Sequence, residues 1–207
     1  MAITYPLDLL ANWPGWSTEF ALLYRQEQSR QANGRTLVKD FGSPLWQASY
    51  TTRSLRPNEL DEWRARLASL ENGLQTFRGY ALSRCRPQAH PGNGALATGN
   101  LLVIRADRKS IQVNQLTPNM RLTVGDMIQM GDRDLHQVME TRTAVSTGWI
   151  DTDFEVRPHI WPGVTTNTPV SVVKPSCVMT VVPGSISSTA DLATGRGAVS
   201  FQAIEAR

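Results

Sequence analysis

A single segment of this 207-residue chain, residues 57–72, carries the periodicity of an α-helix. Its apolar side chains recur at spacings of three and four residues and form one stripe, which consists of Leu60, Trp63, Leu67 and Leu70. Pro57 suits a first helical turn, and Asn72-Gly73 is a typical C-terminal stop. With one amphipathic helix in so long a chain, the core must be built mainly from β-strands, against which the helix packs.

The residues before the helix alternate between apolar and polar side chains, as half-buried strands do. Residues 17–27 place Phe20, Leu22 and Tyr24 on one face. Asn33-Gly34 predicts a tight hairpin turn, and a further alternating strand carries Trp46. The sequence therefore predicts a sheet whose core includes Phe20, Leu22, Trp46 and the apolar stripe of the helix.

After the helix the chain becomes a series of short strands separated by turns. We expect strands at residues 101–104, 111–113, 127–130, 135–139, 148–150, 154–156, 170–173, 178–182 and 199–204. Residues 84–100 and 163–170 are rich in turn-forming residues and predict domain boundaries, whereas residues 184–197 predict a mobile loop. Short strands at regular spacing are typical of a small barrel or sandwich.

The first 16 residues are apolar but irregular. They carry Leu7, Leu9, Leu10, Trp13 and Trp16, while two prolines and a glycine exclude a long helix. These side chains must be covered, either by their own domain or by a neighbouring subunit. On an irregular segment the second alternative is favoured, and Leu7, Leu9, Trp13 and Trp16 are therefore candidate subunit-interface residues.

The charge balance indicates a mixed surface. The net charge is +3, from 21 basic and 18 acidic residues, and no run of five or six Lys or Arg occurs, so no specific nucleic-acid partner is expected. The sequence shows no secretory signal and no apolar run of membrane-spanning length, so we expect cytoplasmic folding and no membrane partner. For Cys85 and Cys177 we expect two reduced thiols, and a disulfide between them stays the alternative.

No residue pattern indicates catalysis. His90, His136 and His159 do not have the spacing of metal ligands. The Gly-rich segments at residues 92–94 and 195–197 lack the Lys-Ser/Thr of a phosphate loop. We therefore predict a non-enzymatic protein without a cofactor or a metal.

The acidic residues suit turns better than a calcium or glycosidase site. Asp126, Asp132 and Asp134 lack the ligand spacing of a calcium loop, and the Gly-Asp pairs are typical of hairpin turns. Asp107 and Glu155 would form a glycosidase pair only if the fold brought them together.

Two stretches of the sequence resemble phage tail proteins. The aromatic strand PLWQASYTT, the helical segment LRPNELDEWRARLASLENG and the following TFRGY resemble the N-terminal hub of bacteriophage (siphophage) distal tail proteins and related tail-tip structural proteins. The later stretch LTVGDMIQMGDRDLHQVMETRTAVSTGWIDTDFEVRPHIWPGV is similar to a segment that recurs in siphophage tail proteins. The resemblance covers most of the chain as organisation, and none of its motifs is catalytic.

The resemblance implies a mainly β fold with one amphipathic helix. In that family the hub is a split β-barrel, and some members carry a second small β-barrel, oligonucleotide-fold-like, inserted in it. Residues 1–90 and 165–207 would then form the hub, including the helix at residues 57–72, and residues 91–164 the inserted barrel. Six copies of a distal tail protein close into a ring below the tail tube.

The resemblance predicts a structural subunit of the virion, assembled in the host cytoplasm. Its partners would be itself, as a ring homo-oligomer and by analogy a hexamer, together with the tail tube protein and the tail-tip hub or baseplate proteins. Two other functions stay open because the chain has six tryptophans. One is a carbohydrate-binding module of the tail tip with Trp149 and Trp161 as platforms, and the other is a single-stranded nucleic-acid-binding β-barrel.

Overall fold

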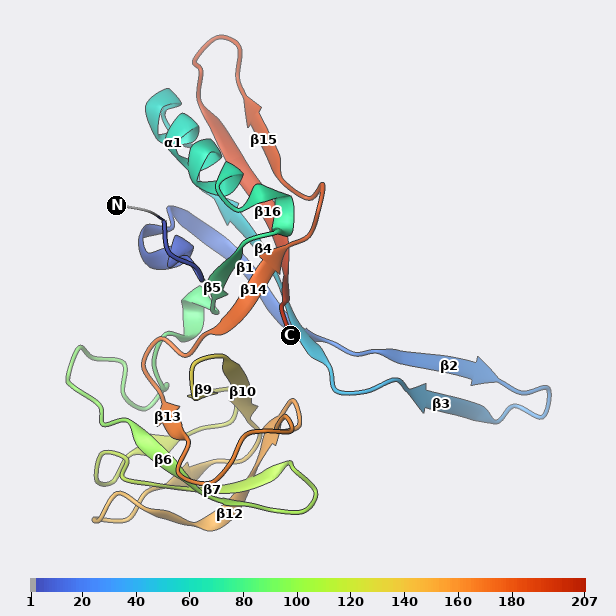
Figure 1. Cartoon of the computed structure of the whole chain (residues 1–207), viewed down its shortest axis with the longest axis vertical. Coiled ribbons are helices and arrows are strands. Elements are labelled where there is room, and N and C mark those ends of the chain that lie inside the picture. Colours follow the sequence, from blue (N-terminus) through green and yellow to red (C-terminus); the bar gives the residue numbers. More distant parts are fainter. Residues whose placement is uncertain (1–2) are drawn as a thin grey trace.

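The computed structural model describes residues 3–207. It is a mainly β structure with one α-helix, α1 (Pro57–Ala68), and the sequence-based prediction of that fold class is confirmed. Figure 1 shows an open sheet with α1 above, a barrel below, and a two-stranded ribbon that projects sideways from the region between them.

The open sheet has six strands, all paired antiparallel. Its order is β1 (Gly15–Leu23), β4 (Leu45–Thr52), β16 (Gly197–Glu205), β14 (Cys177–Val181) and β5 (Thr76–Gly79), and β15 (Ser187–Ala190) also pairs with β16. The pair β5–β14 joins residues on either side of the barrel segment in the sequence. The chain therefore leaves this sheet after β5 and returns to it at β14.

The helix covers one face of this sheet and completes a core rich in aromatic residues. The core contains the predicted residues Trp46, Leu60, Trp63, Leu67 and Leu70, and Phe20 and Leu22 pack against it half-buried. The helix is shorter than the predicted range because residues 71–73 all have positive φ. A Cβ on Gly73 would lie 2.5 Å from the Val181 carbonyl oxygen, so the close approach of this turn to β14 requires glycine.

The apolar N-terminal segment lies on its own sheet. A short 3₁₀ helix, η1 (Leu9–Asn12), follows a parallel bridge between Leu7 and Phe77 at the edge of β5. Two backbone hydrogen bonds fix that bridge, from the Leu7 N–H to the Thr76 oxygen at 3.0 Å and from the Arg78 N–H to the Leu7 oxygen at 2.9 Å. In this segment, Leu9, Leu10 and Trp13 are buried by their own domain.

The second β body is a closed barrel of six strands. Their order is β10 (Asp134–Val138), β12 (Ile150–Arg157), β7 (Ser110–Asn114), β6 (Gly99–Ile104), β13 (Pro169–Ser171) and β9 (Met127–Met130), which pairs back to β10. Two short strands, β8 (Arg121–Leu122) and β11 (Arg142–Thr143), pair with each other outside the barrel. Oligonucleotide-fold barrels have five strands, so the strand count here differs from that expectation.

Several predicted boundaries shift. Strand β13 lies beyond residue 164 and nevertheless pairs with β6 and β9, so the barrel extends past the predicted inserted segment. Residues 184–197 hold β15, so this stretch is not only a loop. The predicted strands 148–150 and 154–156 belong largely to one strand, β12. Short 3₁₀ turns, η2 (Glu71–Gly73) and η3 (Leu82–Arg84), flank β5.

Candidate functional site

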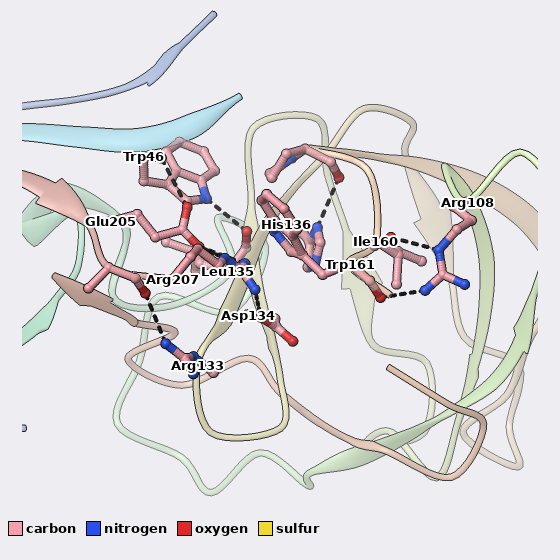
Figure 2. Close-up of polar contacts among 12 residues, drawn as sticks. Trp46, Arg108, Arg133, Asp134, Leu135, His136, Ile160, Trp161, Glu205 and Arg207 are labelled. Atoms are coloured by element: carbon pink, nitrogen blue, oxygen red, sulfur yellow. Dashed lines mark hydrogen bonds and ion pairs between the residues drawn. The ribbon is translucent and has the colours of Figure 1, made fainter. Parts of the chain in front are cut away.

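The sheet and the barrel meet at a buried junction, which Figure 2 shows. The Trp46 indole N–H donates to the Leu135 carbonyl oxygen of the barrel at 2.8 Å. Met127 and Leu135 of the barrel also belong to the apolar core of the sheet. Strands β9 and β10 therefore pack directly against the body that contains α1.

Arg207 links the two bodies by charge. Its guanidinium pairs with Glu205 of the sheet at 2.6 Å and with Asp134 of the barrel, and it stacks on the Trp161 ring at 4.0 Å from the centroid. The side chains of Arg207 and Glu205 are only 22% and 1% exposed. Breaking such a buried pair leaves a charge without compensation, so this cluster fixes how the barrel sits on the sheet.

The titration of Glu205 reflects this environment. Burial raises the pKa of its carboxyl, while Arg207 and the Trp46 backbone N–H, which donates to the carboxylate at 3.1 Å, act in the opposite direction. A raised carboxyl pKa is also found at catalytic acids. Here, however, the carboxylate oxygens bond to Arg207 and to the Trp46 backbone N–H, an arrangement typical of a structural ion pair.

Two of the three histidines, His90 and His136, have hydrogen-bond partners in the backbone. Burial lowers the pKa of His136 to about 4, so its ring is neutral and Nδ1 donates to the Pro158 oxygen at 3.0 Å. The His90 Nε2 accepts from the Arg121 N–H at 3.0 Å. Burial also lowers the pKa of His159. Within residues 3–207, no group of three or more His, Cys, Asp or Glu side chains could hold a metal ion.

The acidic residues singled out in the sequence have separate roles. Asp107 accepts from the N–H groups of Lys109 and Ser110, and Asp126 accepts from the Thr123 N–H at 2.7 Å. Glu155 pairs with Arg157 at 2.6 Å. These contacts are turn caps and an ion pair. Both cysteine thiols, at residues 85 and 177, are free.

For two of the four candidate subunit-interface residues, Leu9 and Trp13, the prediction needs a correction. Leu9 and Trp13 are buried in the core of the sheet, where Trp13 contacts the rings of Trp63 and Phe201 with centroids 4.9 and 5.5 Å away. Leu7 is half-buried against the same core. The side chain of Trp16 lies outside the described part of the chain. In this fold Leu9 and Trp13 therefore have almost no surface left to offer to a neighbour.

Exposed surface is found instead on a projecting ribbon, for which the sequence predicts a hairpin but not its projection from the sheet. Residues 24–41 form this ribbon, called the arm below. It contains strands β2 (Gln26–Arg30) and β3 (Thr36–Asp40), and all ten residues of these strands are exposed. The arm extends the β1–β4 hairpin beyond the sheet (Figure 1). Its ladder continues to its base, where the Phe41 N–H donates to the Arg25 oxygen at 2.9 Å.

The arm exposes apolar side chains as well as charge. Its exposed apolar residues are Tyr24, Leu37, Val38 and Phe41, of which Val38 is 60% exposed. An isolated two-stranded hairpin is only marginally stable in water, and neither face of this one is covered. Such a ribbon gains stability when a partner covers it, so the arm is the strongest candidate for an assembly element.

The tryptophans that would bind carbohydrate differ in access. Trp149 is 44% exposed on the barrel. Trp161 is half-buried, and Arg207 already occupies one face of its ring. The barrel therefore offers one accessible platform.

The barrel also lacks the charge of a nucleic-acid interface. Residues 91–164 contain seven Lys or Arg and eight Asp or Glu, so this segment is slightly acidic. Three of its ion pairs, Arg105–Asp153, Arg142–Glu140 and Arg157–Glu155, neutralise basic groups at the surface. The barrel therefore has few basic side chains that could make the phosphate contacts on which single-strand binding depends.

Comparison of the chain with protein-family models and with curated proteins finds no match. Among the described residues, no helix has the length and apolar character needed to cross a membrane.

Proposed function

We propose that this chain is a structural subunit of a siphophage tail tip, which forms a ring that joins the tail tube to the tip or baseplate proteins. The observation that carries the proposal is the arm, a β-hairpin that projects from the body with every strand residue exposed. A protein whose surface function is assembly needs extended contact elements more than it needs a cleft.

In the proposed ring, the arm is one half of a head-to-tail contact between neighbouring copies. The arm lies on one side of the molecule and differs in shape from the remaining surface (Figure 1). Two copies joined through an arm on one and a different surface on the other make a head-to-tail contact, and repeated head-to-tail contacts close into a ring when the rotation permits. The chain therefore has the means to build a closed oligomer from identical copies.

The finer architecture belongs to the same proposal. In it the open sheet with α1 is the split-barrel hub of a distal tail protein, and the six-stranded barrel is the inserted domain, oligonucleotide-fold-like. Its support is the pairing of β5 with β14, two strands that lie on either side of the barrel strands in the sequence. In this arrangement six copies form the ring, the partners are the tail tube protein and the tip hub or baseplate proteins, and the protein resides in the virion without enzymatic activity.

The proposal is tested by the oligomeric state. We expect the purified full-length chain to form a ring, seen by native mass spectrometry and by negative-stain electron microscopy. Replacing residues 26–40 by Asn-Gly joins Arg25 to Phe41, which already face each other across the hairpin, and gives an arm-deleted chain. That variant should be a folded monomer, and a full-length chain that stays monomeric at its highest soluble concentration would overturn the proposal.

One observation favours a second candidate function. The exposed Trp149 ring offers a stacking surface of the kind that binds sugars. Binding of the full-length chain to host polysaccharide that is lost in Trp149→Ala, with Trp161→Phe as the comparison, would support this alternative. Absence of binding by the wild-type chain would dismiss it.

A further inference from the structure

The face of the open sheet opposite α1 is almost free of charge. Side chains alternate across the sheet, and Phe20 and Leu22 point into the core, so their neighbours in β1 point outward. The outward side chains of β1, β4 and β16 that line this face include Glu19, Ala21, Leu23, Gln47, Ser49, Gln202 and Ile204. Glu19 is the only ionisable residue in this set. A solvent-facing sheet normally carries many more charged side chains.

The same face is hollowed. A depression of about 530 Å³ lies across β1, β4 and β16 and reaches Val182 after β14. Its lining is mainly apolar or amide, with Leu23 at the end nearest the arm. Within residues 3–207 no helix covers this hollow, because α1 packs on the other face. The hollow is therefore an open, weakly polar surface with one carboxylate.

The arm has the complementary properties. Between residues 24 and 41 it carries four basic side chains against two acidic ones, namely Arg25, Arg30, Arg35 and Lys39 against Glu27 and Asp40. It also exposes the apolar side chains of Leu37, Val38 and Phe41. Its excess positive charge matches the single acidic group of the hollow, and its apolar side chains match the apolar lining.

The arm of a chain does not fill the hollow of the same chain. It points away from both β bodies (Figure 1), and its strands are exposed along their full length. We propose that the hollow on the outer sheet face receives the arm of a neighbouring copy. This inference rests on the proposed ring, and it assigns the two halves of the contact that joins one subunit to the next.

The test blocks each half of the contact separately. Ala21→Arg with Gln202→Arg adds bulk and positive charge to the hollow at two exposed positions, so the core stays intact. Thr152→Arg on the barrel, also exposed, is the matched control. We expect the double variant to be a folded monomer by circular dichroism and analytical ultracentrifugation, and the control to form the same ring as the wild-type chain.

Mixing gives the decisive result. The arm-deleted chain keeps its hollow, and the hollow-blocked chain keeps its arm, so an equimolar mixture should form a one-to-one heterodimer and nothing larger. A cysteine pair, Val38→Cys on one chain and Ser49→Cys on the other in a Cys85→Ser background, should cross-link that heterodimer. A wild-type ring that persists in the hollow-blocked variant would overturn this inference and leave the ring intact, whereas a monomeric wild-type chain would overturn the proposed function itself.

Discussion

The junction and the arm use their polar and apolar groups in opposite ways. At the junction, Trp46 and Arg207 bond to Leu135 and Asp134 of the barrel, and the buried Glu205 carboxylate accepts from Trp46 and pairs with Arg207. In the arm, the hydrogen bonds run within the hairpin itself, and its apolar side chains face solvent. The junction stabilises the subunit, whereas the arm has exposed apolar surface that another molecule could cover.

This difference separates folding from assembly within a single chain. A substitution in an element that stabilises the fold lowers the free energy of unfolding of the protein. A substitution in an element that only contacts a partner should change that free energy little until the partner binds. Stability is measured by urea unfolding in the arm-deleted chain unless stated otherwise, so that assembly does not contribute to the measured free energy.

The largest effect is expected at Trp13, the predicted interface residue that lies in the core. Trp13→Ala removes a ring in contact with Trp63 and Phe201 and should lower the free energy of unfolding by about 3–5 kcal/mol. If the variant keeps its stability as a monomer and only the full-length chain loses its ring, Trp13 belongs to an interface after all.

The next largest effect is expected at Arg207. Arg207→Ala leaves Glu205 and Asp134 without their partner in a buried cluster and should lower the free energy of unfolding by about 3 kcal/mol. Arg105→Ala is the matched control, since its pair with Asp153 is 50% and 39% exposed and should contribute less than about 1 kcal/mol. Equal effects of the two substitutions would mean that the junction is no more than a surface contact.

The pH dependence of the junction follows from His136. Its folded pKa of about 4 lies below the ordinary value of 6.5, so the unfolded chain binds the proton more readily. The contribution of His136 to stability is therefore complete above pH 6.5 and is lost as the pH falls toward 4. Lowering the pH from about 7 to about 5 should reduce the free energy of unfolding by about 2 kcal/mol through this group.

Other groups at the junction act on the same measurement. Glu205 has a raised pKa and changes stability in the opposite sense, because the folded state takes up its proton first as the pH falls. Asp134 and Arg207 act on His136 in opposite directions. The difference between wild type and His136→Asn isolates the histidine, since asparagine offers an N–H to the Pro158 oxygen without titrating. The same pH slope in both chains would contradict the assignment.

The sequence predicted the elements better than their exposure. The apolar stripe of the helix could be predicted because helical spacing places its residues on one face whatever surrounds them. This stripe consists of Leu60, Trp63, Leu67 and Leu70. The core position of Trp13 could not be predicted from the sequence, because it depends on a bridge between Leu7 and Phe77, which are 70 positions apart. The same holds for the junction, since no local signal in the sequence connects Asp134 to Arg207, which lies 73 positions away.

For the arm, too, the sequence predicts the element but not its exposure. Asn33-Gly34 predicts its turn, but whether a hairpin lies on a sheet or leaves it depends on what the adjoining strands pair with. The alternation of residues 17–27 predicts one strand, whereas in the structure β1 ends at Leu23 and β2 begins at Gln26. That break turns the hairpin out of the sheet, and no periodicity in the sequence marks it.

The smallest effect on folding is expected in the arm itself. In the full-length chain, diluted until it is monomeric, Val38→Ser should change the free energy of unfolding by less than about 0.5 kcal/mol, because its side chain is already in water. Val181→Ser, at a buried position of β14, is the matched control and should lower it by several-fold more. At high protein concentration, where the ring forms, Val38→Ser should weaken assembly of the ring more than Val181→Ser does. A loss above about 1 kcal/mol in the monomer would place Val38 against its own chain and remove the distinction between arm and body.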